Sequence, residues 1–107
     1  MEEIDNRELV QAARKGDRQA FGALVERYQG MVYGVCLRMT ADSFEAEDLA
    51  HDAFIDAFLK IGQLEEVERF SGWLRTLTLN VCRMWLRAQK GVWKGEGDES
   101  EAVATES

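Results

Sequence analysis

Basic and amide side chains recur at helical spacing between residues 75 and 87, where they could share one polar face. Its members are Arg75, Thr76, Leu79, Asn80, Arg83 and Arg87. Arginine binds phosphate groups, and the amide of asparagine both donates and accepts hydrogen bonds at a base edge. The pattern is typical of a nucleic-acid-binding face. On composition alone, an ordinary solvated basic helix surface is an equally good interpretation.

A second candidate binding face lies earlier in the chain, where acidic and aliphatic residues recur at three- and four-residue steps. Its members are Asp48, His51, Asp52 and Ile55, and the pattern continues through Asp56 and Leu59. Aliphatic residues exposed among acids favour docking of a basic helix, although helix surfaces are commonly acidic. His51 has no second metal ligand and no nucleophile at a useful spacing, so the sequence predicts no catalytic set and no metal site.

Charge is sorted along the chain. Residues 45–69 contain eight acidic residues and two basic ones, whereas residues 70–95 contain five basic residues, three tryptophans and no acid. The whole chain of 107 residues has a net charge of -7. This order predicts a basic partner for the first segment and an anionic partner for the second.

These faces need helices to position them, and apolar residues recur at three- and four-residue steps through most of the chain. The sequence has no proline, no signal peptide and no apolar run of membrane-spanning length. We predict an all-α fold, a compact bundle of three main helices plus a short N-terminal helix, in a cytoplasmic protein. Residues 1–90 form the domain, and residues 91–107 form an acidic flexible tail or linker because they contain few apolar residues.

The helix ends and the core follow from capping residues and from the apolar pattern. Aspartate or serine is expected to cap the first three helices, at Asp5, at Asp17, and at Asp42 or Ser43. Gly16 and Gly62 are expected to end the first and third helices. The buried side of the fourth helix is predicted to contain Phe70, Trp73, Leu74, Leu77, Val81, Met84 or Trp85, and Ala88. Cys36 and Cys82 lie in apolar patterns, which predicts two buried reduced thiols.

Three segments, in order, resemble region 2 of the extracytoplasmic-function (ECF) sigma factors of the sigma-70 family. They are the Gly-Asp-x-x-Ala-Phe motif at residues 16–21, the AEDLAHDAF segment at residues 46–54, and the F-x-x-W-L motif with its later asparagine at residues 70–80. The resemblance covers about residues 5–90. It implies a transcription initiation domain that is not an enzyme and uses no cofactor.

The resemblance also assigns roles to residues. In the family, the helix with the AEDL segment docks on the clamp coiled coil of the largest RNA polymerase subunit, which corresponds here to Asp48, His51, Asp52 and Ile55. The family's next loop and helix read the promoter -10 element and hold a flipped base of the non-template strand. The corresponding residues here are Leu64, Arg69, Arg75, Thr76, Asn80, Arg83, Met84 and Arg87. An anti-sigma factor is a further candidate partner.

The sequence departs from the family at four of these positions. His51 stands where glutamine is usual, Asp52 where glutamate is usual, Thr76 where arginine is frequent, and Met84 where an acid or amide is frequent. Three glutamates, Glu65, Glu66 and Glu68, also place negative charge in the predicted recognition loop.

Two further interpretations stay open at this stage. The helix-turn-helix that reads the -35 element in the family is absent from the sequence, so we expect an excised domain, a truncated form or a shortened relative. The alternative function is a protein-protein adaptor without DNA binding, which engages an inhibitor or another acidic partner. Asn80 with Arg75 and Arg83 on one face favours DNA binding, because an adaptor would not need that combination.

Overall fold

The helices follow one another in the order that the sequence predicts. In the computed structural model, which describes residues 6–93 and the side chains of residues 6–89, α1 spans Asn6–Arg14, α2 Arg18–Thr40, α3 Ser43–Lys60 and α4 Phe70–Trp93. Two short 3-10 turns, η1 (Ile61–Gln63) and η2 (Val67–Arg69), join α3 to α4. The predicted all-α fold of three main helices and a short N-terminal helix is confirmed.

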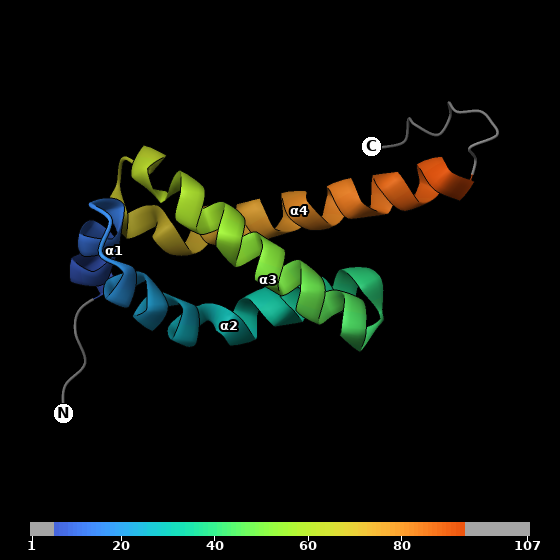
Figure 1. The fold of residues 1–107 in the computed structure, drawn as a ribbon, viewed down its shortest axis with the longest axis horizontal. Helices are drawn as coiled ribbons and strands as arrows, with labels where there is room; N and C mark the ends of the chain where they lie inside the picture. Colours follow the sequence, from blue (N-terminus) through green and yellow to red (C-terminus); the bar gives the residue numbers. More distant parts are fainter. Residues whose placement is uncertain (1–5, 94–107) are drawn as a thin grey trace.

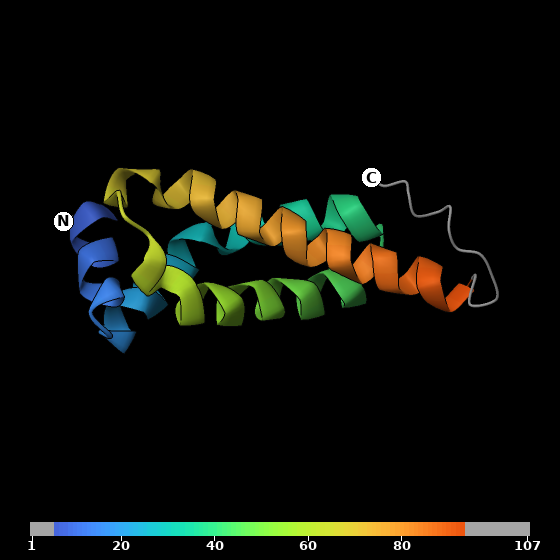
Figure 2. The same cartoon turned by 90° about the horizontal axis from the view of Figure 1, so that it is seen from above.

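The three long helices pack against one another, and α1 closes one end of the bundle. The chain runs along α2, returns along α3 and runs forward again along α4 (Figure 1). Helix α1 contacts α2 and both 3-10 turns, so it lies beside the loop that leads into α4. In both views, the C-terminal end of α4 projects beyond the turn between α2 and α3 (Figure 2).

Aspartate side chains cap the N-termini of α2 and α3, as predicted. The Asp17 side chain accepts a hydrogen bond from the Ala20 amide at 3.1 Å. The Asp42 side chain accepts from the amides of residues 44 and 45 at 2.9 and 3.2 Å, so Asp42 rather than Ser43 is the cap of α3. These bonds satisfy amides that have no partner within the helix, and each cap contributes about 1 kcal/mol.

The ends of the helices agree with the prediction less closely. Gly16 has a φ of 101° after α1, which is the predicted left-handed turn. The prediction that Gly62 ends α3 in a left-handed conformation is wrong. Helix α3 ends at Lys60 and continues directly into the 3-10 turn η1, which contains Gly62. The last left-handed residue before α3 is Ala41, with a φ of 57°.

Helix α4 continues through Gly91 to Trp93, so the predicted end of the helix before residue 91 is also wrong. Glycine inside a helix costs only about 1 kcal/mol relative to alanine, which the surrounding turns can offset. Residues 94–107 of the predicted tail, and the predicted cap Asp5, lie outside the described residues.

The core is continuous through the bundle and includes both cysteines. Phe70 is 1% exposed, and its ring lies edge-on to Tyr28 at 5.3 Å and 5.8 Å from the ring of Trp73. Cys36 and Cys82 are buried and free, as predicted. Within the part of the chain that the structure describes, no helix is both long and apolar enough to cross a membrane.

The core side of α4 differs in two places from the prediction. Trp85 packs against the core, whereas Met84 is 65% exposed, which resolves the predicted alternative in favour of Trp85. Ala88 is exposed, contrary to the prediction. Thr78 is fully buried instead, and its hydroxyl donates to the Leu74 carbonyl at 2.8 Å, so the buried polar atom is satisfied within the helix.

Phe70→Ala is expected to lower the free energy of unfolding by about 3–5 kcal/mol, because it removes a fully buried ring at the junction of the loop and α4. A loss of that size unfolds a marginal domain. Urea and thermal unfolding followed by far-UV circular dichroism measure it. Met84→Ala on the same helix is the control and should change stability by less than about 0.5 kcal/mol. Equal melting of the two variants would contradict the central position of Phe70.

Candidate docking and nucleic-acid surfaces

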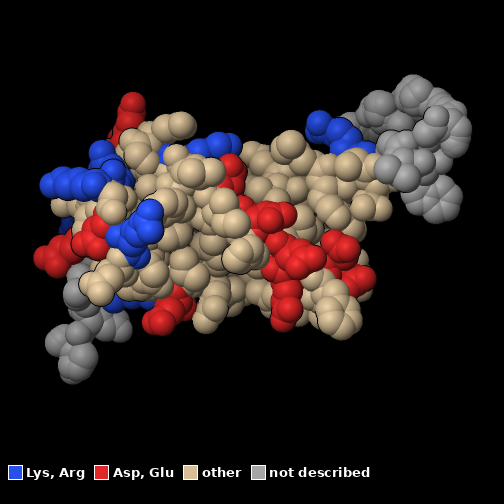
Figure 3. All heavy atoms as spheres, viewed as in Figure 1, with Lys and Arg blue, Asp and Glu red and all other residues tan. Residues whose placement is uncertain are grey.

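Helix α3 presents the predicted acidic face to the outside. Asp48, His51, Asp52 and Ile55 are all exposed, and Ile55 is 48% exposed. The opposite side of the helix is buried through small or apolar residues, namely Ala46, Leu49, Ala53 and Ala57. Figure 3 shows acidic side chains gathered over the N-terminal half of α3. The structure therefore brings the four predicted docking residues onto one surface.

Two large apolar side chains extend this surface at its ends. Phe44 is 81% exposed in the first turn of α3, and Leu59 is 72% exposed in the last turn. We call the combined surface the docking stripe, which consists of Phe44, Asp48, His51, Asp52, Ile55 and Leu59. The sequence analysis did not include Phe44 in this surface, because the pattern of acidic and aliphatic residues that it followed begins at Asp48. The predicted cap at Asp42 or Ser43 was the signal that could have added Phe44, since it places residue 44 in the first turn of the helix.

Charge on the docking stripe is not neutralised within the domain. Asp56 beside it pairs with Lys60 at 3.3 Å, one turn further along the helix. Among the described residues, Asp48 and Asp52 form no ion pair, so both carboxylates are available to an external cation. Exposed carboxylates next to large exposed apolar side chains suit a partner that is itself both basic and apolar.

Helix α4 presents the predicted basic face. The side chains of Arg75, Thr76, Asn80, Arg83 and Arg87 are exposed, while Leu79 is partly buried. Met84 is exposed on the same helix. Figure 3 shows Lys and Arg side chains along the edge that α4 forms. Because α4 contains arginines and no acidic residue, its exposed side has a net positive charge.

Asn80 and Arg83 form a hydrogen bond on this face. The Arg83 guanidinium Nη1 donates to the Asn80 side-chain oxygen Oδ1 at 3.3 Å. With its oxygen engaged, the Asn80 amide presents its Nδ2 donors to any ligand on the helix surface. Asn80 in this arrangement suits a base edge that offers acceptors.

The loop between α3 and α4 has its apolar side chains buried in the core and its charged side chains exposed to solvent. Leu64 is 6% exposed and Val67 is 8% exposed. Leu64 therefore anchors the loop in the core, and its predicted role as a DNA-contacting side chain is corrected: the tight turn at η1 directs it inwards. Among the predicted loop residues, Arg69 is the one that remains at the surface.

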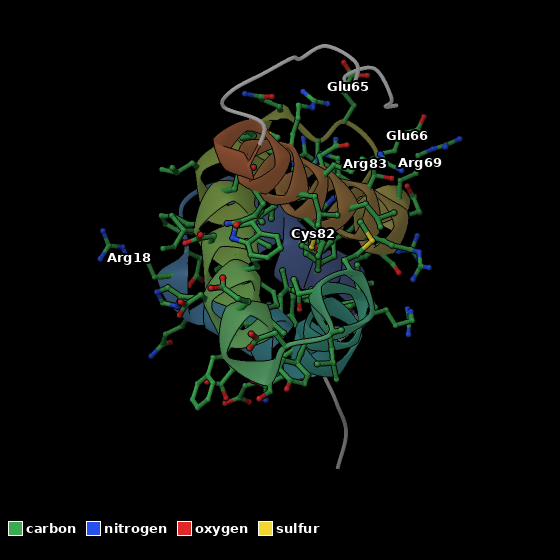
Figure 4. The ribbon with its side chains drawn as sticks, turned by 90° about the vertical axis from the view of Figure 1, so that its right-hand side faces the viewer. Arg18, Glu65, Glu66, Arg69, Cys82 and Arg83 are labelled. Atoms are coloured by element: carbon green, nitrogen blue, oxygen red, sulfur yellow. The ribbon has the colours of Figure 1, made fainter. Side chains whose placement is uncertain are left out.

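Ion pairs on the outside of the loop involve three charged loop residues and one arginine of α1. The Arg69 Nε lies 2.6 Å from the Glu66 Oε1, and the Arg7 Nη1 of α1 lies 3.9 Å from the Glu68 Oε2. All four side chains are largely exposed, so each pair contributes less than about 1 kcal/mol. In the view along the bundle, Glu65, Glu66 and Arg69 lie on the same side as Arg83 (Figure 4).

The described residues offer no constellation for a metal ion. No group of three or more histidine, cysteine, aspartate or glutamate side chains within residues 6–89 is placed to bind one.

Comparisons with known proteins agree with this arrangement. Residues 24–92 match the family described as Sigma-70 region 2. The chain is 35% identical over 81 residues to the ECF RNA polymerase sigma factor SigW of Bacillus subtilis, a match that covers 76% of this chain and 43% of SigW. It is 33% identical over 84 residues to the RNA polymerase sigma-H factor of Pseudomonas aeruginosa, covering 78% of this chain and 44% of that protein.

A solved structure shares the fold. It is an NMR structure of an engineered region 2 of sigmaE in complex with GTAAAA, with a TM-score of 0.78 and 33% sequence identity, and the match covers 85% of this chain and 96% of that one. The present chain spans less than half the length of the two curated relatives. The family match, the relatives and the shared fold show that this chain belongs to the sigma-70 family of RNA polymerase sigma factors, with the ECF members among its relatives, and that its helical domain is a region 2.

Proposed function

We propose that this domain attaches to core RNA polymerase through the docking stripe and reads the single-stranded -10 promoter element through α4 and the loop before it. The observation that carries the proposal is the separation of an exposed acidic and apolar surface on α3 from an exposed basic surface on α4. The likeness to a sigmaE region 2 in complex with GTAAAA supports the DNA half of the proposal.

The docking stripe suits the clamp coiled coil of the polymerase largest subunit. Phe44, Ile55 and Leu59 expose apolar surface that a partner helix would cover, and burying a side chain of this size stabilises a complex by about 1.5–3 kcal/mol. Asp48 and Asp52 would face basic residues on the partner. An anti-sigma factor with the same mixture of basic and apolar residues would compete for this surface.

The basic face suits an unpaired DNA strand. Arg75 and Arg87 would bind phosphates, Asn80 would contact a base edge, and Met84 would pack against a base. The hydrogen bond from Arg83 fixes the Asn80 oxygen, so the bound base is expected to offer acceptors at the contacted edge. Holding an unstacked base in this way offsets an unstacking cost of a few kcal/mol.

The loop between α3 and α4 attracts phosphate less strongly than α4 does. Glu65 and Glu68 place negative charge at its surface, and Glu66 holds the Arg69 guanidinium. We infer that the loop positions the DNA mainly through its shape, while α4 supplies most of the electrostatic attraction. Binding of the isolated domain to single strands is accordingly weak, with a shallow dependence on salt concentration.

Asp48→Arg or Asp52→Arg is expected to reduce the affinity for core RNA polymerase by at least about 100-fold, because charge reversal across an interface costs several kcal/mol. Pull-down and fluorescence anisotropy with purified core enzyme measure the loss. Glu26→Arg, an equal change of charge at an exposed position of α2, is the matched control and should bind normally. If the α3 variants keep their fold and bind core polymerase like the parent chain, the docking assignment is wrong.

Asn80→Ala is expected to reduce discrimination between -10-matched and scrambled single strands by about 1–3 kcal/mol without changing the salt dependence. Arg87→Ala should weaken binding to all strands alike and reduce the salt slope by about 0.7. Arg83→Ala should show both effects, because Arg83 also orients Asn80. Titrations of fluorescent oligonucleotides at several salt concentrations separate these outcomes.

The matched control for the arginine variants is Arg18→Ala, since Arg18 lies on the other side of the bundle from Arg83 (Figure 4). It should leave DNA binding unchanged. An equal loss for matched and scrambled strands in Asn80→Ala would remove Asn80 from base recognition. Normal binding to core polymerase with no affinity for any strand would instead favour the adaptor function.

A further inference from the structure

The two cysteines meet in the core, although they are 46 positions apart in the sequence. Cys36 lies on α2 and Cys82 on α4, and both are 0% exposed. The Sγ atoms of Cys36 and Cys82 lie 3.7 Å apart, within the distance of a thiol-thiol hydrogen bond. Figure 4 shows Cys82 directed between the helices rather than to the outer side of α4. The free thiols are therefore neighbours across a helix-helix interface.

We propose that Cys36 and Cys82 form an oxidisable dithiol that a hydroperoxide converts into an intramolecular disulfide between α2 and α4. The sulfur atoms of a disulfide lie about 2.05 Å apart, so the two sulfurs must approach by about 1.7 Å from their present 3.7 Å. Rotation of the cysteine side chains and a small relative shift of the two helices can supply this movement. The proposal is independent of the proposed function.

The reaction balances with one hydroperoxide per disulfide. The thiolate of one cysteine attacks the peroxide, which breaks the O–O bond, releases an alcohol and leaves a sulfenic acid on the protein. The second thiolate then attacks that sulfur and forms the S–S bond, and the hydroxide that leaves is protonated to water. Two thiols and one hydroperoxide give one disulfide, one alcohol and one water, with two electrons passing from the sulfurs to the peroxide.

Burial sets the rate of the first step. Burial, followed by the hydrogen bond and charge of Cys82, raises the pKa of Cys36 to about 12. Burial also raises the pKa of Cys82, an effect that its hydrogen bond with Cys36 partly offsets. The reactive thiolate is therefore scarce at neutral pH, and the first oxidation requires a local opening of the helices. The rate of disulfide formation is expected to rise with pH throughout the range below these pKa values.

The neighbouring thiol sets the outcome of the second step. When the helices close again after the first oxidation, the second cysteine lies beside the sulfenic acid, and the closed site, which is 0% exposed, admits no dissolved thiol. Closing the disulfide is therefore favoured over capture by an external thiol. The bond would hold α4, the helix of the basic face, against α2.

The test treats the full chain with hydrogen peroxide in native buffer, blocks remaining thiols and digests with trypsin. Cleavage after arginine places Cys36 in the peptide of residues 28–38 and Cys82 in the peptide of residues 76–83. The expected product is one linked pair of these peptides, lighter by two hydrogen atoms and separated again by dithiothreitol. The oxidised monomer should also melt about 10 °C or more above the reduced one, because the bond closes a long loop in the unfolded chain.

Two variants serve as controls, since Cys36→Ala and Cys82→Ala each leave a single thiol. Neither should give a linked pair within one chain, and neither should show a rise in Tm on oxidation. The proposal is overturned if the folded parent chain keeps both thiols while a guanidinium-unfolded sample oxidises. Oxidation to sulfinic acid without a linked pair, or an oxidised monomer that melts below the reduced one, would overturn it as well.

Discussion

Burial of Phe70 is the constraint on which both surfaces of this domain depend. Phe70 is the first residue of α4, its ring meets Tyr28 of α2, and the Tyr28 hydroxyl accepts a hydrogen bond from the Asn6 side chain of α1 at 2.7 Å. With Leu64 and Val67 buried three residues apart before it, the loop can lie on the core in only one register. That register directs the loop glutamates outward and determines which side of α4 faces solvent.

The two surfaces differ in charge because each occupies the solvent side of a different helix in one packed bundle. On α3, alanines on the buried side allow close contact with the bundle, so the larger residues of the docking stripe remain outside. On α4, Leu74, Cys82 and Thr78 fill the interior, which leaves the arginines exposed. A partner on either surface would therefore act on a rigid body, since the spacing between the two surfaces is fixed by core packing rather than by a flexible linker.

Sequence reasoning predicted the features that depend on local chemistry. The caps at Asp17 and Asp42, the fold class and the exposed sides of α3 and α4 follow from side-chain hydrogen bonding and from the 3.6-residue period. It failed where tertiary packing overrides a local signal, as at Leu64, which packs into the core together with Val67 although the loop around them is mostly polar and charged. The contact of Cys36 with Cys82 was also inaccessible, because hydrophobic periodicity identifies a buried side without giving the register between two helices.

The turn after α2 contains a residue whose backbone conformation lowers the stability of the domain. Ala41 adopts a φ of 57°, and its amide closes the helix by donating to the Leu37 carbonyl at 2.8 Å. A side chain with a Cβ pays about 1–2 kcal/mol for that conformation, whereas glycine adopts it freely. Replacing Ala41 by glycine would also raise the conformational entropy of the unfolded chain, which offsets part of the stabilisation. The difference is a small reserve of stability, of the kind expected in a protein whose fold only has to exceed a threshold.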